Sequence, residues 1–119
     1  MLRYGHVELF VRDPAVARDF YRDVLGLRVD AEQGGGQFVW IDANGSPLLL
    51  RPAREVPSRA ATYQSADQAI VLYTDDLDGS RAALESRGLV LAGTDGSPRC
   101  LTFTDPDGHW FQLVDPGDH

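Results

Sequence analysis

The sequence predicts an α+β fold made of two tandem β-α-β-β-β modules whose strands form a cupped mixed sheet. The prediction rests on three observations. The same order of elements occurs twice along the 119 residues. Each copy opens with a strand and an Asp that starts a helix, and each ends as strand, tight turn, strand. We expect one domain over residues 1–119, with module one at about 1–52, a linker at about 53–67 and module two at about 68–116.

The first strand of module one is HVELFVRD, residues 6–13, because its apolar residues alternate with the period of two that a half-buried strand shows. The alternation gives it two faces, one with Val7, Leu9 and Val11 and the other with His6, Glu8 and Phe10. Each half of this size forms one sheet with a helix on one face only. We therefore expect His6, Glu8 and Phe10 on the open, cup-facing side.

A helix is predicted after this strand, with Asp13 as its N-cap, Pro14 in its first position and Gly26 at its end. Its apolar residues at helical spacing are Val16, Phe20, Val24 and Leu27. A strand around 27–32 and a hairpin with an Asn44-Gly45 turn complete the module.

Module two repeats the order: AIVLYTDD as a strand, DLDGSRAALESRG as a helix closing at Gly88, a strand around 89–92, and RCLTFTDPDGHWFQLV as a hairpin. Matching the turns, Gly45 to Gly108, sets the register of the repeat. In that register Phe38 and Trp40 correspond to Leu101 and Phe103, so we expect both aromatic side chains on the helix-facing side.

Composition and charge exclude several classes of protein. Eleven basic and 18 acidic residues give a net charge of −7, which repels nucleic acid and anionic membranes. The longest apolar runs, such as residues 48–50, are far shorter than the roughly 20 residues that span a bilayer, and the N-terminus lacks a secretory signal. Cys100 is the single cysteine, so no internal disulfide exists and a cytoplasmic protein is expected.

Three stretches together resemble the vicinal oxygen chelate superfamily, which includes glyoxalase I, extradiol dioxygenases, fosfomycin-resistance enzymes and bleomycin-resistance proteins. They are HVELFVRDPAVARDFYRDVLGL, VLYTDDLDGSRAALESRGL and FTDPDGHWFQLV, and they cover nearly the whole chain. The resemblance implies the glyoxalase/bleomycin resistance/dioxygenase fold. It also implies a homodimer with its cavities at the subunit interface.

Enzymes of this family usually bind a divalent metal such as Fe, Mn, Ni or Zn through the first and last strand of each half. The resemblance and the repeat register place those positions at His6, Leu49, Ala69 and Gln112. Leu and Ala cannot coordinate, and two neutral donors are too few for such an ion. We therefore expect no metal cofactor. The alternative is a site of His6, Glu8 and Gln112, because Glu8 shares the face of His6.

We expect the partner to be a small molecule, aromatic or cationic, held in the cup. Its predicted contacts are His6, Glu8, Phe10, Leu49, Tyr73, Thr102, Trp110 and Gln112. Cys100 also falls on the cup face and is expected to be a buried apolar thiol.

Other polar residues near the cup have ordinary structural explanations. Glu8 is expected to pair with Arg12, Arg51 or Arg99, because an unpaired carboxylate would be costly in the cup. His109 and the terminal His119 are not expected to be ligands. Asp105, Asp107 and Gly108 are assigned to turn formation.

The favoured function is a metal-independent small-molecule binding protein similar to the bleomycin-resistance branch, which would sequester an antibiotic or an aromatic metabolite. The first alternative is a glyoxalase-like or dioxygenase-like lyase or oxidoreductase that uses a metal held by His6, Glu8 and Gln112. The second is a metal-free enzyme of the same superfamily in which His6 or Glu8 acts as the base. The missing donors at Leu49 and Ala69 count against the metal enzyme, and they do not separate the other two.

Overall fold

The structure is a computed structural model, and it describes residues 1–118. The prediction for His119 therefore lies outside the described residues. The chain divides into two compact units, Met1–Pro57 and a second that begins at Ser58. Seven strands in two mixed sheets and two α-helices give the mixed α+β class that the sequence predicts.

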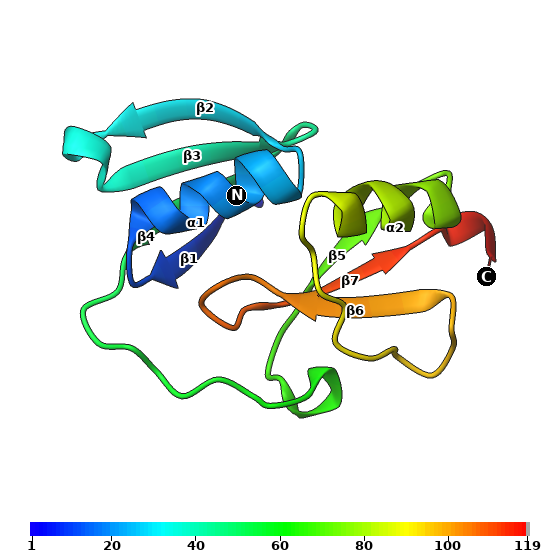
Figure 1. Cartoon of the computed structure of the whole chain (residues 1–119). Coiled ribbons are helices and arrows are strands. Elements are labelled where there is room, and N and C mark those ends of the chain that lie inside the picture. The colour runs from blue at the N-terminus through cyan, green and yellow to red at the C-terminus, as the bar shows by residue number, and fades with distance from the viewer. Residues whose placement is uncertain (119) are drawn as a thin grey trace. The chain divides into compact units, whose positions relative to one another are not determined.

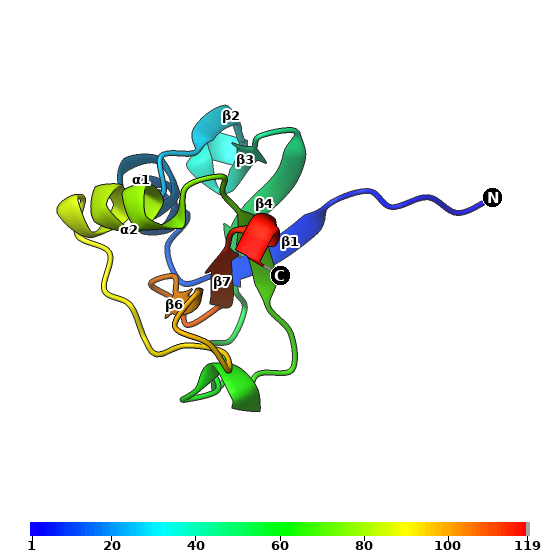
Figure 2. The ribbon, with the colours of Figure 1, turned by 90° about the vertical axis from the view of Figure 1, so that its right-hand side faces the viewer.

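The first unit contains a four-stranded sheet of order β1-β4-β3-β2 (Figure 1). The strands are β1 (Val7–Val11), β2 (Arg28–Gln33), β3 (Phe38–Ala43) and β4 (Ser46–Pro52). β1 runs parallel to β4, and the other pairs are antiparallel. The residues before β1 extend away from this sheet (Figure 2).

Helix α1 (Pro14–Asp19) covers one face of this sheet and continues as a π-helical turn, Phe20–Val24 (Figures 1 and 2). It begins as predicted, because the Asp13 carboxylate accepts a hydrogen bond from the Ala15 amide at 2.9 Å. Gly26 ends it with φ of 72°.

The predicted apolar stripe of α1 is wrong by one position. Val16 is 54% exposed, and the side chains that α1 and its π-helical turn bury are Pro14, Ala17 and Tyr21, with Leu25 after them. The buried residues are also spaced to lie on one helical face, so periodicity alone could not choose between them and the predicted stripe.

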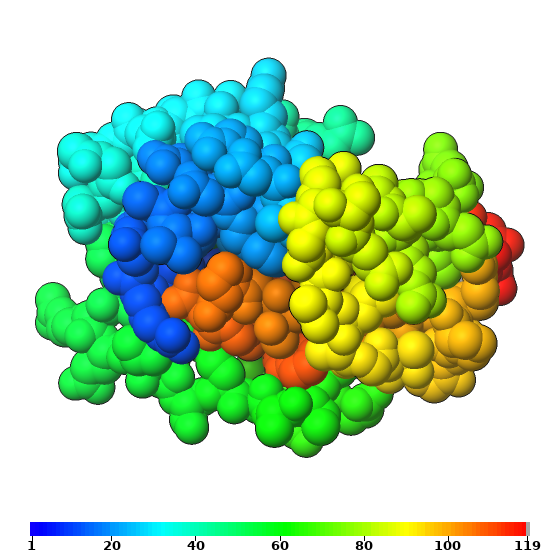
Figure 3. Space-filling model, in the orientation of Figure 1, coloured from blue at the N-terminus to red at the C-terminus, as the bar shows by residue number. Residues whose placement is uncertain are grey.

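The second unit contains a three-stranded sheet of order β5-β7-β6. Its strands are β5 (Ile70–Tyr73), β6 (Cys100–Thr104) and β7 (Trp110–Val114). Helix α2 (Leu77–Ser86) covers one face, and its outward residues form the surface seen on that side in Figure 3. Asp76 caps α2 by accepting from the Gly79 amide at 3.0 Å.

The strand predicted around residues 89–92 is replaced by irregular backbone. This segment still follows β6, because the Ala92 amide donates to the Thr102 carbonyl and Thr94 forms an isolated bridge with Leu101. The positive φ of 85° at Gly93 interrupts the extended geometry that a continuous strand requires. Three short 3-10 turns occupy Gly34–Gly36, Tyr63–Ser65 and Pro116–Asp118.

The two hairpins differ in length by one residue. In the first, Ile41 pairs with Leu48 across a two-residue turn in which Asn44 and Gly45 have φ of 55° and 100°. In the second, Phe103 pairs with Phe111, which leaves one more residue between the paired positions. The turn match predicted from sequence is therefore correct for β4 and β7 and wrong by one residue for β3 and β6.

This difference corrects the faces predicted for Phe38 and Trp40. In β3 the side chains with no exposure are Val39 and Ile41, which pack toward α1. Phe38 and Trp40 alternate with them and lie on the open face. Because the strand period is two, the one-residue error in register placed both aromatic side chains on the wrong side of the sheet.

Among residues 1–118 no helix has the length and apolar character needed to cross a bilayer. Each unit instead buries its own apolar face. In the second unit the rings of Phe103 and Phe111 stack with centroids 5.2 Å apart, and neither side chain is exposed.

Candidate functional site

The open face of the first sheet carries a compact group of side chains, which we call the first-unit cluster. Its members are His6, Glu8, Phe10, Phe38, Trp40, Leu49 and Arg51. Strand register brings them together: Glu8 lies opposite Leu49, and Leu49 lies opposite Trp40, while Phe10 lies opposite Arg51 in the adjacent row. Leu49 is 6% exposed, so the middle of the cluster is a buried apolar side chain.

A chain of charged contacts runs along the cluster. One Glu8 oxygen lies 2.9 Å from His6 Nε2, and the other accepts from Arg51 Nη1 at 3.0 Å. The hydrogen bond from Arg51, followed by that from His6, holds the pKa of the Glu8 carboxyl below its ordinary value. Arg51 is thus the partner of Glu8 among the three arginines that the sequence allowed.

Aromatic rings frame these charges. The His6 ring meets Trp40 edge to face with centroids 4.7 Å apart, and Trp40 Nε1 donates to Gln33 at 3.2 Å. The Arg51 guanidinium lies 5.0 Å from the centroid of Phe10 and 5.4 Å from that of Phe38. Stacking of this kind fixes a guanidinium while leaving its charge paired. The result is a preformed aromatic and polar surface.

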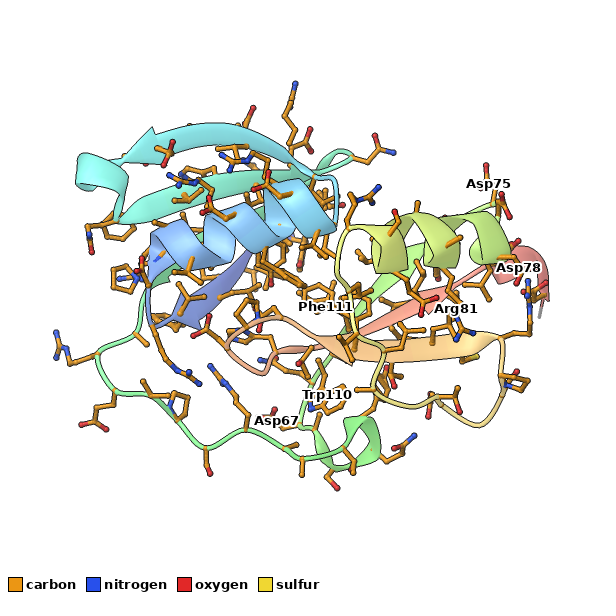
Figure 4. All side chains as sticks on the ribbon, in the orientation of Figure 1. Asp67, Asp75, Asp78, Arg81, Trp110 and Phe111 are labelled. Carbon is orange, nitrogen blue, oxygen red and sulfur yellow. The ribbon has the colours of Figure 1, made fainter. Side chains whose placement is uncertain are left out.

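In the second unit, residues 58–66 lie along the face of the sheet that carries Trp110 and Gln112, and we call this segment the strap. Trp110 and Phe111 project from opposite faces of β7 (Figure 4). The indole Nε1 of Trp110 donates to the Ala60 carbonyl at 2.9 Å, and its ring meets Tyr63 edge to face at 6.1 Å. The residues predicted as linker therefore include this strap, which belongs structurally to the second unit.

Gln112 is the centre of a polar network under the strap. Its amide nitrogen donates to the Tyr63 hydroxyl at 2.8 Å and, at a longer 3.4 Å, to an Asp95 carboxylate oxygen. Gln64 approaches the other Asp95 oxygen at 3.3 Å and the Thr94 carbonyl at 3.1 Å. The strap and the segment before β6 are thus tied together above β7.

The remaining predicted residues of the second unit share this face. Val71 pairs with Gln112, and Tyr73 pairs with Val114, so Tyr73 lies on the side of Gln112 and is 74% exposed. Thr102 lies beside Gln112 and has no exposure, and its buried hydroxyl is satisfied by donating to the Ala92 carbonyl at 2.7 Å. Cys100 is 8% exposed on the same face, as expected for an apolar thiol.

The turn before β7 holds a buried histidine and carboxylate pair. His109 Nδ1 lies 2.7 Å from an Asp105 oxygen, and Arg59 of the strap reaches His109 Nε2 at 3.0 Å. A guanidinium only donates, so Nε2 is the acceptor and Nδ1 carries the proton that Asp105 accepts. The side chain of Asp105 has no exposure. His109 therefore fastens the strap to the turn, and Asp105, predicted only to form the turn, also holds the His109 ring.

The four positions at which the family binds a metal do not fit a divalent ion here. Leu49 and Ala69 carry no donor atom, and His6 Nε2 is bonded to Glu8. In the alternative site, Glu8 and His6 lie together in the first unit, whereas Gln112 lies in the second unit with its amide nitrogen bonded to Tyr63. Within the described part of the chain no three His, Cys, Asp or Glu side chains form a metal-binding group.

Sequence reasoning missed several polar and aromatic members of both faces. Trp40 and Phe38 were missed because of the register, and counting residues between hydrophobic strand positions, rather than matching glycines, would have found them. Tyr63 and Asp95 lie in segments without periodicity, so only their contacts with β7 identify them.

Comparison with known proteins agrees with this architecture. The family model for the Glyoxalase/Bleomycin resistance protein/Dioxygenase superfamily matches residues 3–113. Metallothiol transferase FosB from Lysinibacillus sphaericus is 28% identical over 113 residues, covering 92% of this chain and 79% of that protein. Metapyrocatechase from Pseudomonas sp. strain CF600 is 29% identical over 118 residues, covering 95% of this chain and 38% of that protein.

Among known structures, the antibiotic binding protein TnmS3 from Streptomyces sp. CB03234 superposes with a TM-score of 0.72. It is 28% identical, and the match covers 98% of this chain and 99% of TnmS3. The similarity extends over nearly the whole chain, and it agrees with the family match and with the two repeated units. The chain belongs to the Glyoxalase/Bleomycin resistance protein/Dioxygenase superfamily.

Proposed function

We propose that this protein binds a small aromatic molecule, an antibiotic or another aromatic metabolite, and sequesters it without a metal ion and without turnover. The first-unit cluster is the observation that carries the proposal. Its aromatic rings offer apolar contact to a flat ligand, and the buried Leu49 packs between them. His6 and Arg51 are each bonded to Glu8 in advance, so the three side chains can orient a ligand at little entropic cost.

The charge of the cluster favours an aromatic ligand over a simple cation. The Glu8 carboxylate already accepts from Arg51 at 3.0 Å, and the pair is neutral overall. A cationic ligand would have to compete with that guanidinium for the same oxygens. A planar, uncharged or weakly polar ligand would instead add apolar contacts with the rings of Trp40, Phe10 and Phe38, which meet His6 and Arg51.

Relatives support this class of function. TnmS3, 28% identical, is described as an antibiotic binding protein. FosB, also 28% identical, is described as a metallothiol transferase. Because the metal positions of this chain include Leu49 and Ala69, the binding protein is the better guide. We further propose that two copies associate and that the ligand binds in a cavity at their interface, with Phe10, Tyr73, Trp110 and Gln112 among its contacts.

The proposal is tested with protein stripped of metal by a chelator. Calorimetric titration against a panel of aromatic antibiotics should find a ligand that binds one per chain and is recovered chemically unchanged. Trp40→Leu should weaken that binding about tenfold through lost stacking, whereas Val90→Ala, an exposed position, should leave it unchanged.

The metal-dependent rival is tested in the same preparation. Thermal unfolding is measured with Mn, Fe, Ni, Co and Zn ions, since a ligand that binds only the folded state raises Tm. Unchanged Tm values agree with the proposal. A large increase with one ion, together with stoichiometric metal in the untreated protein, would overturn it.

A metal-free enzyme is the second candidate, and the contact between His6 and Glu8 favours it. An imidazole bonded to an ionised carboxylate at 2.9 Å is the arrangement that a general base requires. The binding panel distinguishes this candidate, because an enzyme would return altered ligand. His6→Gln would then abolish conversion while leaving ligand affinity within a few fold.

A further inference from the structure

We propose that Tyr63 and Gln112 together recognise a lactam or primary carboxamide on the ligand. The Tyr63 hydroxyl would donate one hydrogen bond to that group, and Gln112 Oε1 would accept another from it. This inference rests on the proposed binding function and specifies the chemistry of the ligand. Tyr63 lies in the strap, outside every strand and outside the predicted contacts.

The orientation of the Gln112 amide follows from its neighbours. A carboxylate only accepts hydrogen bonds, so the side of Gln112 that faces Asp95 must be the NH₂ group. The same nitrogen lies 2.8 Å from the Tyr63 hydroxyl and donates to it. Both N–H groups of Gln112 are therefore directed at Asp95 and Tyr63, and Oε1 remains as the group that can accept from a ligand.

Tyr63 is complementary to Gln112. Its hydroxyl oxygen accepts from Gln112, which leaves the phenolic proton to donate elsewhere. Among residues 1–118 no hydrogen bond uses that proton or Gln112 Oε1. The strap and β7 thus present one donor and one acceptor from directly bonded side chains.

Nearby contacts hold this pair in place. Tyr63 packs against Trp110, whose indole is bonded to Ala60, three residues before the 3-10 turn Tyr63–Ser65. Asp95 is fixed from the other side by Gln64. Tyr63 and Gln112 are both half-buried, so a ligand can reach them while water is partly excluded. Such an environment strengthens each hydrogen bond and increases the cost of leaving one unmade.

The Tyr63 hydroxyl donates and Gln112 Oε1 accepts, so the matching ligand group carries an acceptor next to a donor. A lactam or primary carboxamide does so in one plane, with its carbonyl accepting from Tyr63 and its N–H donating to Gln112 Oε1. A carbonyl alone or an N–H alone would leave one of the two protein groups unpaired. Planar bicyclic lactams combine this group with a flat apolar body, which is the kind of ligand that the proposed function requires.

The test compares quinolin-2-one, which has the paired groups, with N-methylquinolin-2-one and with naphthalene. Calorimetric titration of the wild-type protein should give affinity for quinolin-2-one about tenfold above that for either analogue. Tyr63→Phe and Gln112→Leu should each remove this preference. Tyr4→Phe, at a 79% exposed position of the first unit, is the matched control and should retain it.

The outcomes separate this inference from the proposed function. Equal affinity for all three compounds, unchanged in Tyr63→Phe, would mean that aromatic binding occurs and that the paired recognition is wrong. A preference that persists in both variants would also overturn the inference. No binding of any aromatic compound would overturn both proposals. Circular dichroism of each variant verifies that the fold is retained.

Discussion

Glu8 carries the only carboxylate of the first-unit cluster, and its protonation gives a test at the scale of one residue. Arg51 and His6 lower its pKa in the folded protein below the ordinary value of 4.5. A group with a lowered folded pKa stabilises the protein above its unfolded pKa, and that stabilisation is lost as pH falls through the folded value.

Glu8→Gln should therefore lower Tm slightly near neutral pH, and the difference from wild type should begin to close as pH falls below 4.5. The effect is small because the pair is partly exposed. Thermal unfolding followed by circular dichroism across this pH range measures it. Glu55→Gln removes the same charge from an exposed position. Identical pH profiles for the two variants would contradict the role of Arg51.

Asp105 gives a second test at this scale, because its buried carboxylate accepts from the Asp107 and His109 amides and from the His109 ring. Asp105→Asn keeps an oxygen for the amides and presents N–H groups to the imidazole. We expect a loss of about 2 kcal/mol in the free energy of unfolding, measured in urea. Asp30→Asn, at an exposed position, should cost far less. Equal losses would contradict the proposed strength of this pairing.

At the scale of elements, β3 separates the core of the first unit from its open face. Ile41 has no exposure, so Ile41→Ala should cost about 2–5 kcal/mol through lost burial and a cavity. Trp40→Ala should cost less stability and should weaken ligand binding more. Urea unfolding and calorimetric titration of both variants measure the two effects. A larger loss of stability in Trp40→Ala than in Ile41→Ala would mean that the Trp40 side chain lies on the helix-facing side.

The strap is an element without regular structure whose contacts predict its behaviour. Arg59 reaches His109 and the Asp107 carbonyl, and its stem packs so closely on Gly108 that a Cβ there would lie 2.8 Å from Arg59 Cγ. Arg59→Met should loosen the strap and expose the indole of Trp110. In a Trp40→Phe background, acrylamide should quench the remaining tryptophan more strongly. Arg54→Met in the same background is the control. Equal quenching in the two variants would contradict the proposal that Arg59 holds the strap in place.

How far sequence predicts these elements depends on where the determining contacts lie. Local chemistry located Asp13, the Asn44-Gly45 turn and the capped start of α2, because each involves neighbours in sequence. The open face of β1 also followed from alternation alone. Trp40 was misplaced, since its side depends on how many residues separate paired strands across a turn.

The candidate site shows the same division. Glu8 and His6 were predicted to share one face of a strand, and their side chains lie 2.9 Å apart on that face. Tyr63 could not be predicted, because its place over Gln112 depends on a path through residues that carry no periodic pattern. Long-range packing of irregular segments is decided by contacts that have no local signature.

At the scale of the whole molecule, each unit leaves apolar side chains on its open face. Phe10 is 45% exposed on the first sheet, and Val71 and Tyr73 are 46% and 74% exposed on the second. Exposed apolar groups on the open face of a sheet are typical of an interface. We expect sedimentation to give a mass twice the 13.1 kDa of one chain.

Val71→Lys should shift that mass toward one chain by placing a charge at the interface. Val16→Lys changes a residue of similar exposure on the outer side of α1 and should leave the mass unchanged. A single-chain mass in the wild-type protein would contradict the proposed dimer.

The strap also determines where this chain could exchange a half with a relative. A recombination junction near residue 67, at the start of the predicted second module, would join β5–β7 to a foreign strap. Trp110, Gln112 and His109 would then lose Ala60, Tyr63 and Arg59, the partners that satisfy their polar atoms. A junction between Pro57 and Ser58 keeps every one of these pairs within a single parent. Chimeras of this fold should therefore be joined before the strap, so that the strap comes from the same parent protein as the hairpin it covers.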